Sequence, residues 1–263
     1  MPRRTIYVSD YETAVRQGRS QGTGSSYTPG LFVRDTASQA TCTRLWSPKL
    51  GRLVQLLSHG EVNAFLQLEW LSSVIDIREQ FFLDPLVTKS ICKQLHLVHP
   101  NVKGRDIVMT TDFVVTRHKE GRVYFEAYQV KRSPADLTPR TRAKLKVESL
   151  YWETQGVNWG VLYSEQFNTV QCNNLTRLHV WQGEKPTPAD ARTLAEAFCR
   201  ARRSFAQSRP SEVPLGVRLE DGRTLNFLEV MMMLTALHFV EFPLREVDIT
   251  QCPVGLFTEA VHV

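Results

Sequence analysis

The segment VYFEAYQVKR, residues 123 to 132, alternates like a β-strand and ends with an amide and an ammonium group, Gln129 and Lys131. Side chains on a strand point alternately to its two faces, so these groups extend an apolar stripe that includes Phe125 and Ala127. Burying an unpaired ammonium group costs free energy. The sequence therefore predicts that a carboxylate lies close to Lys131.

That carboxylate is expected on the preceding strand, IVMTTDFVV at residues 107 to 115, which carries Asp112. The intervening HKEGR is typical of a hairpin turn. A turn centred near Lys119 places Asp112 and the Gln129–Lys131 segment at comparable distances from the tip. Glu61, on a helix predicted upstream, supplies a second carboxylate.

An aspartate, a turn, an amide or acid two residues before a lysine, and an upstream helical glutamate are the arrangement of metal-dependent nucleases. Phosphodiester hydrolysis uses Mg²⁺ to stabilise charge on the phosphate and to acidify a water, and Mg²⁺ prefers carboxylate and carbonyl oxygens. We predict as ligands Glu61, Asp112, the Gln129 amide and the backbone carbonyl of Val130, with Mn²⁺ able to replace Mg²⁺. Lys131 is predicted to orient or deprotonate the water and to neutralise developing charge.

Each of these residues also fits a purely structural role. Glu61 stands three residues after Ser58, as in a capping box, which taken alone is the more common use of such a glutamate. Asp112 fits equally well an aspartate that holds a loop at a strand end. The Gln129–Lys131 segment also suits an edge strand protected by its lysine. The order of the motif and its local secondary structure favour the nuclease interpretation.

The elements around this motif predict an α/β core with a mixed sheet. In chain order we expect a hairpin at 43–57, a helix at 58–71, a strand at 73–83, the hairpin already described, a helix from Pro139 to Gln155 and a strand at 157–164.

The pattern changes after residue 165. Residues 166–178 are polar and loop-like, a helix starts at Thr187 and Pro188, an apolar helix covers 225–240, and short strands or a wing follow at 241–257. Short helices with a terminal β element predict a winged-helix-like domain. We therefore expect two domains, at 1–165 and 166–263.

Composition restricts the class of protein less sharply. The net charge of +5 and the pI near 9.0 permit a nucleic-acid partner without showing one. Five scattered cysteines predict neither a zinc site nor a disulfide framework and fit a reducing cytoplasm. The first residues lack the continuous apolar segment of a signal peptide, and no stretch of the chain approaches 18 apolar residues. We therefore expect neither secretion nor membrane insertion. The Gly- and Ser-rich loop at 17–30 lies by Arg16 and Arg19, which could track DNA phosphates; simple disorder fits this loop about as well.

Longer segments carry a resemblance to a known family: GRSQGTGSSYTPGL, LLSHGEVNAFLQLEWLSSVIDIREQFFL, TTDFVV, YQVK and KLKVESLYWETQGVNWGVLYS. Over residues 16–164 the chain resembles the TnsA-like endonucleases of Tn-seven-like transposons. The resemblance implies a restriction-endonuclease-like fold. It matches four positions to the family's first acidic residue, metal-binding aspartate, metal-site amide and catalytic lysine: Glu61, Asp112, Gln129 and Lys131. Glu148 matches a further glutamate near the site, although an exposed helix residue paired with Lys144 is the more common role of such a glutamate.

The resemblance also implies an activity and partners. Family members cut the 5′ ends of the transposon, on the non-transferred strands, while a TnsB-like transposase cuts and joins the 3′ ends. Their C-terminal region is winged-helix-like and contacts a TnsC-like AAA+ regulator. We therefore expect an Mg²⁺-dependent endonuclease acting on transposon-end DNA in the bacterial cytoplasm. The alternatives are a catalytically silent DNA- or protein-docking subunit and a stand-alone restriction or repair nuclease.

Overall fold

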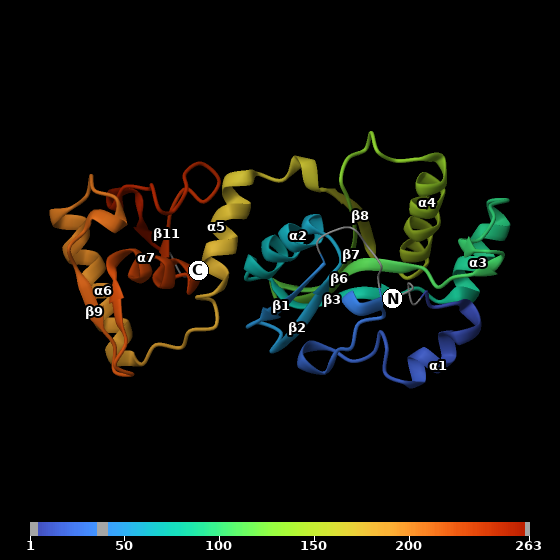
Figure 1. Cartoon of the computed structure of the whole chain (residues 1–263), viewed down its shortest axis with the longest axis horizontal. Helices are drawn as coiled ribbons and strands as arrows, with labels where there is room; N and C mark the ends of the chain where they lie inside the picture. Colours follow the sequence, from blue (N-terminus) through green and yellow to red (C-terminus); the bar gives the residue numbers. More distant parts are fainter. Residues whose placement is uncertain (1–4, 36–41, 261–263) are drawn as a thin grey trace. The chain divides into compact units, whose positions relative to one another are not determined.

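The structure is a computed structural model that describes residues 5–35 and 42–260. The chain divides into two compact units, Met1–Gln166 and Phe167–Val263, drawn in blue to yellow-green and in yellow to red in Figure 1. The boundary between the units lies one residue beyond the predicted position. Among the described residues, no helix has the length and apolar character needed to cross a membrane.

A four-stranded mixed sheet forms the centre of the first unit. Its strands are β3 (Val74–Phe82), β6 (Thr110–Lys119), β7 (Arg122–Lys131) and β8 (Asn158–Tyr163), in the order β3-β6-β7-β8. The β3–β6 and β6–β7 pairs are antiparallel, whereas β7 and β8 are parallel. The predicted hairpin and mixed sheet are thus confirmed.

Helices cover both faces of this sheet (Figure 1). Phe113 packs against Phe65 of α2 (His59–Trp70). The next residue along β6, Val114, belongs instead to a core cluster with Val147 of α4 (Pro139–Thr154) and Ile91 of α3 (Pro85–Gln94). Because consecutive strand residues point to opposite faces, α2 lies on one face and α3 and α4 on the other.

Helix α3 is absent from the predicted elements, although its start carries a clear signal. Pro85 occupies the first turn, and the Asp84 side chain caps the helix by accepting a hydrogen bond from the Leu86 N–H at 2.8 Å. The remaining elements of the first unit are short. They are α1 (Tyr11–Arg16), β1 (Thr43–Ser47), β2 (Arg52–Leu56), β4 (Asn101–Val102), β5 (Arg105–Asp106) and the 3-10 turns Val8–Asp10, Gly24–Ser26, Val33–Asp35 and Ser164–Gln166.

The expected apolar core face of β7 is only partly correct. Ala127 is fully buried, but Val123 and Phe125 are 58% and 46% exposed. The Arg78 guanidinium lies over the Phe125 ring, 5.4 Å from its centroid. The strand therefore packs into the core only at the end where it approaches Gln129.

As far as residue 260, the second unit contains three helices and two short antiparallel strand pairs. The helices are α5 (Thr169–His179), α6 (Pro188–Ser204) and α7 (Phe227–Ala236); the strands are β9 (Gly216–Arg218), β10 (Thr224–Asn226), β11 (Val240–Glu241) and β12 (Thr258–Glu259), with 3-10 turns at Pro210–Glu212 and Val254–Leu256. The loop predicted at 166–178 is wrong, because α5 occupies it. The side chain of Asn168 caps α5, and Cys172, Leu175 and Leu178 form its buried stripe. A winged-helix assignment for this unit stays a prediction.

Candidate active site

The register of the β6–β7 hairpin places Asp112 beside the Gln129–Lys131 segment. The ladder pairs Phe113 with Tyr128, so Asp112 and Gln129 come directly after its last pair. There the Asp112 carboxylate accepts a hydrogen bond from the backbone N–H of Val130 at 2.7 Å. The Asp112 side chain thus holds β7 at the point where the backbone ladder between β6 and β7 ends.

The predicted site residues line one hollow at this end of the sheet. Its lining includes Glu61, Asp112, Gln129, Val130 and Lys131. The convergence that the sequence required of these residues is present in the structure. Their catalytic and metal-binding roles stay predictions.

Glu61 reaches the hollow from the first turn of α2. Ser58 caps this helix as predicted, accepting a hydrogen bond from the Glu61 N–H at 3.2 Å. The Glu61 carboxylate accepts from the Ser58 hydroxyl at 3.0 Å and from the Leu57 N–H at 2.8 Å. A side chain at Gly60 would meet Ser164 at 3.1 Å and Val130 at 3.3 Å, so glycine lets the helix start approach β7 closely. Glu61 therefore combines helix capping with a position in the site.

Gln80 joins the two carboxylates and is absent from the predicted site residues. It lies between Glu79 and Phe81, whose partners Phe113 and Thr111 flank Asp112 on β6, and it is 2% exposed. Its amide donates to Glu61 at 3.1 Å and lies 3.5 Å from the nearer oxygen of Asp112. Its φ of +51° is uncommon for a residue other than glycine. A signal was present: Gln80 is an amide at the apolar end of a buried strand.

The N-terminal loop holds Gln80 in this conformation. The Gly30 N–H donates to the Gln80 carbonyl at 3.0 Å. A Cβ at Gly30 would lie 2.5 Å from that carbonyl oxygen and from the Phe82 ring, so only glycine fits. The Ser20 hydroxyl accepts from the Phe82 N–H at 2.8 Å, and the Tyr27 hydroxyl donates to the Glu79 carbonyl at 2.9 Å. The described loop is thus bonded to the strand that carries Gln80.

Burial dominates the electrostatics of the carboxylate pair. Desolvation raises the pKa of Glu61, and the Asp112 carboxylate raises it further. Desolvation also raises the pKa of Asp112, against the opposing effects of Lys131 and the Val130 N–H. Two buried carboxylates with raised pKa values are ready to exchange protons for a cation.

The donor set fits a hard divalent cation. Besides the two carboxylates it contains Gln129 Oε1, a buried atom that has no hydrogen-bond partner among the described residues. All these donors are oxygens, as Mg²⁺ prefers. Lys131 Nζ donates to the Val130 carbonyl at 2.9 Å, so a metal at that carbonyl would share it with the ammonium group. No group of three His, Cys, Asp or Glu side chains arranged for a metal occurs in the described residues, and this set relies on neutral oxygens beside two acids.

The expected exposed position of Glu148 is wrong. Its side chain is buried and turned toward β6, where it accepts hydrogen bonds from the Thr111 hydroxyl at 2.7 Å and the Trp159 indole N–H at 3.0 Å. It lines a second hollow together with Gln129 and Lys131. Glu148 therefore lies beside the candidate site.

The prediction that Arg19 contacts DNA is not supported by its surroundings. Its guanidinium is buried, forms an ion pair with Asp35 at 2.8 Å and donates to the Gly30 carbonyl at 2.9 Å. These bonds stabilise the N-terminal loop. Arg16 is exposed, and its contact with DNA stays a prediction.

We expect Gln80→Leu to weaken binding of the divalent metal by about 10- to 100-fold, the usual effect of losing a residue that orients ligands. The substitution removes the amide that holds the two carboxylates. Calorimetric titration with Mn²⁺ measures the effect, and Gln67→Leu is the matched control because the Gln67 amide bonds to Asn63 of its own helix. Equal Mn²⁺ affinity in both variants would show that the Gln80 amide does not organise the site.

A pH effect follows from Glu148, whose pKa burial raises to about 8. The unfolded chain has an ordinary glutamate pKa of about 4.3, so between these values the folded protein holds the extra proton. Stability is then greatest at low pH and falls as pH rises through the folded pKa, by up to about 1.4 kcal/mol per pH unit. Glu61 and Asp112 act with the same sign.

We expect Glu148→Gln to flatten the fall in the thermal unfolding midpoint between about pH 6 and pH 8.5 in EDTA. Glu153→Gln, at an exposed position of the same helix, should keep the fall of the unmodified protein. If Glu148→Gln retained the whole pH dependence, the Glu148 carboxyl would not be the group that takes up the proton.

The mixed sheet flanked by helices and the oxygen donors at its hairpin end define a nuclease-like domain. Residues 71–164 match the family model described as "TnsA-like endonuclease N terminal". The chain is also 35% identical to the transposon Tn7 transposition protein TnsA of Escherichia coli over 231 residues, which cover 87% of this chain and 83% of that protein. The chain therefore belongs to the TnsA family of transposition endonucleases.

Proposed function

We propose that the protein is the Mg²⁺-dependent endonuclease subunit of a transposase and cuts the 5′, non-transferred strands at transposon ends. The observation that carries the metal-dependent step is the buried, unbonded Oε1 of Gln129 in a hollow with Glu61 and Asp112. A buried acceptor without a donor is costly, and a cation at this position would satisfy it. Membership of the TnsA family supports the role in transposition.

Each site residue has a distinct part in this proposal. Glu61, Asp112, Gln129 and the Val130 carbonyl would hold the Mg²⁺, which supplies charge stabilisation on the phosphate and a more acidic water. Asp112 is fixed by the Val130 N–H. The Lys131 ammonium group lies at the edge of the donor set, where it orients the attacking water and neutralises charge developing on the phosphate.

The partners follow from the family. We propose that the substrate is transposon-end DNA, that a TnsB-like transposase cuts the 3′ ends, and that residues 167–263 form a winged-helix-like unit that contacts a TnsC-like AAA+ regulator. The relative from E. coli is named as a transposition protein of transposon Tn7, which supports a shared machinery.

The test is a strand-resolved cleavage assay on a plasmid with transposon ends, using this protein and its cognate TnsB-like transposase. With Mg²⁺ we expect cuts on both strands, and without this protein only the 3′ cuts. Absence of 5′ cuts while 3′ cuts form would favour a docking subunit without catalytic activity. Cleavage by this protein alone would favour a stand-alone nuclease.

A further inference from the structure

A group of cations continues outward from the candidate active site along α4. The hollow that contains Gln129 and Lys131 is also lined by Lys144. Lys144 in turn lines a neighbouring hollow with Arg140 and Lys103. Shared lining residues therefore connect the site with a basic surface at the start of α4.

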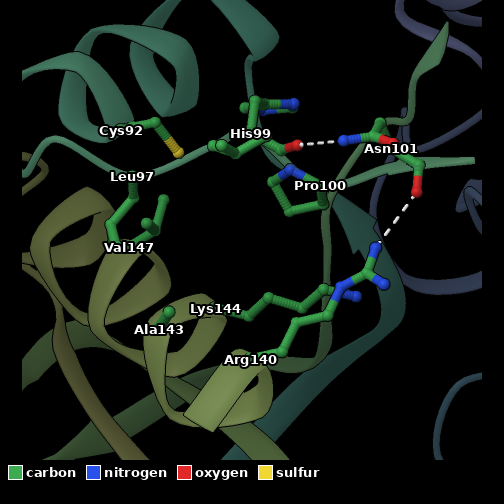
Figure 2. Close-up of a pocket in the computed structure, with 10 residues that line it drawn as sticks. Cys92, Leu97, His99, Pro100, Asn101, Arg140, Ala143, Lys144 and Val147 are labelled. Atoms are coloured by element: carbon green, nitrogen blue, oxygen red, sulfur yellow. Dashed lines mark hydrogen bonds between the residues drawn. The ribbon is translucent and has the colours of Figure 1, made fainter. Parts of the chain in front are cut away.

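Figure 2 shows the pocket on the α3 side of this surface. Arg140 and Lys144, one helical turn apart on α4, extend along the same edge of the pocket toward Asn101. The Arg140 guanidinium donates to the Asn101 carbonyl at 3.1 Å, and the Asn101 amide donates to the His99 carbonyl at 3.1 Å. The backbone of β4 thus orients Arg140 without neutralising its charge.

In the described part of the chain, Lys144 also lacks a counter-charge. Its helical neighbour at i+4 is Glu148, whose carboxylate is turned inward to Thr111 and Trp159. Within residues 5–35 and 42–260, neither Lys144 nor Arg140 forms an ion pair with a carboxylate. Burial lowers the pKa of Lys144, and Arg140 and Lys131 lower it further. Cations held together against their own repulsion favour an anionic ligand.

We propose that Lys144 and Arg140 hold backbone phosphates of the DNA strand that leads into the active site, with Lys131 at the inner end of this track. The proposal rests on the proposed function, because the DNA that these cations would hold is the DNA that the endonuclease would cut. Residues four apart on a helix lie about 5–6 Å apart at Cβ, so each cation meets its own part of the backbone. Such contacts add affinity without reading sequence.

The experiment measures binding of the full chain to a short fluorescent DNA duplex in EDTA, which prevents cleavage, over about 50 to 200 mM salt. We expect Lys144→Gln and Arg140→Gln each to reduce the slope of log affinity against log salt by about 1. At about 100 mM salt each variant should bind about five- to tenfold more weakly. Lys144→Arg should keep most of the affinity because it keeps the charge.

Arg122→Gln is the matched control. It removes the same charge from an exposed position at the other end of β7, about 30 Å along the strand from Lys131. Thermal unfolding midpoints of all variants establish that they are folded. The proposal is overturned if Lys144→Gln and Arg140→Gln match Arg122→Gln in DNA affinity and salt slope. This holds also if the two variants bind DNA normally but lose binding to a partner protein. DNA binding that depends on Lys144 in a protein that never cuts would contradict the proposed function alone.

Discussion

Asp112→Ala is expected to lower the rate of 5′-strand cleavage by about 10³-fold or more, because Mg²⁺ contributes several kcal/mol of charge stabilisation and each 1.4 kcal/mol is a factor of ten. Asp112 is one of two carboxylates in the donor set. Its Oδ2 atom also holds β7 in place by accepting the hydrogen bond of the Val130 N–H. The strand-resolved plasmid assay measures the loss, and the 3′ cuts of the partner transposase serve as an internal standard.

Two further variants separate metal binding from folding. Asp112→Asn keeps an acceptor for the Val130 N–H and removes the buried charge, so the protein should fold as well as the unmodified chain in EDTA yet gain no stability from Mg²⁺. Asp10→Ala, at an exposed position, should cut at the normal rate. Persistence of 5′ cuts in Asp112→Ala would assign Asp112 a structural role at the strand end and remove the basis for the metal site.

Lys131→Met is expected to lower cleavage by about 10²- to 10⁴-fold, the range found for a positioned proton-transfer group. Methionine has similar length and no charge, so the packing of β7 is retained. The Lys131 ammonium group donates a hydrogen bond to the Val130 carbonyl, which is itself one of the predicted ligands. Its removal takes away the cation that orients water and stabilises charge on the phosphate.

Affinity for the metal distinguishes this effect from that of Asp112. Lys131→Met should bind Mn²⁺ within about tenfold of the unmodified protein, since none of the oxygen ligands is lost. Lys119→Met, at an exposed position near the hairpin tip, is the control for loss of one positive charge. If Lys131→Met lost Mn²⁺ affinity by the same factor as its cleavage rate, Lys131 would act by holding the metal ligands in place.

Local sequence signals were sufficient for much of the first unit. Ser58 as a cap and Pro139 as a first helical residue mark the starts of α2 and α4, and the structure has both helices. The polar composition of 166–178 hid α5, because the helix has few apolar positions, of which Cys172, Leu175 and Leu178 are buried. The exposure of Val123 and Phe125 could not be predicted from alternation, which gives the faces of a strand but not how far a helix covers them.

Local sequence was enough to place Asp112 beside the Gln129–Lys131 segment, because a short turn fixes the register of a hairpin and alternation fixes its faces. The surroundings of these residues depend on the packing of the whole unit. Gln80 takes its conformation from contact with Gly30, fifty residues earlier in the chain, and Glu148 turns inward because Thr111 and Trp159 offer hydrogen bonds there. These outcomes depend on packing between segments distant in sequence, where burial and unsatisfied hydrogen bonds outweigh local preference.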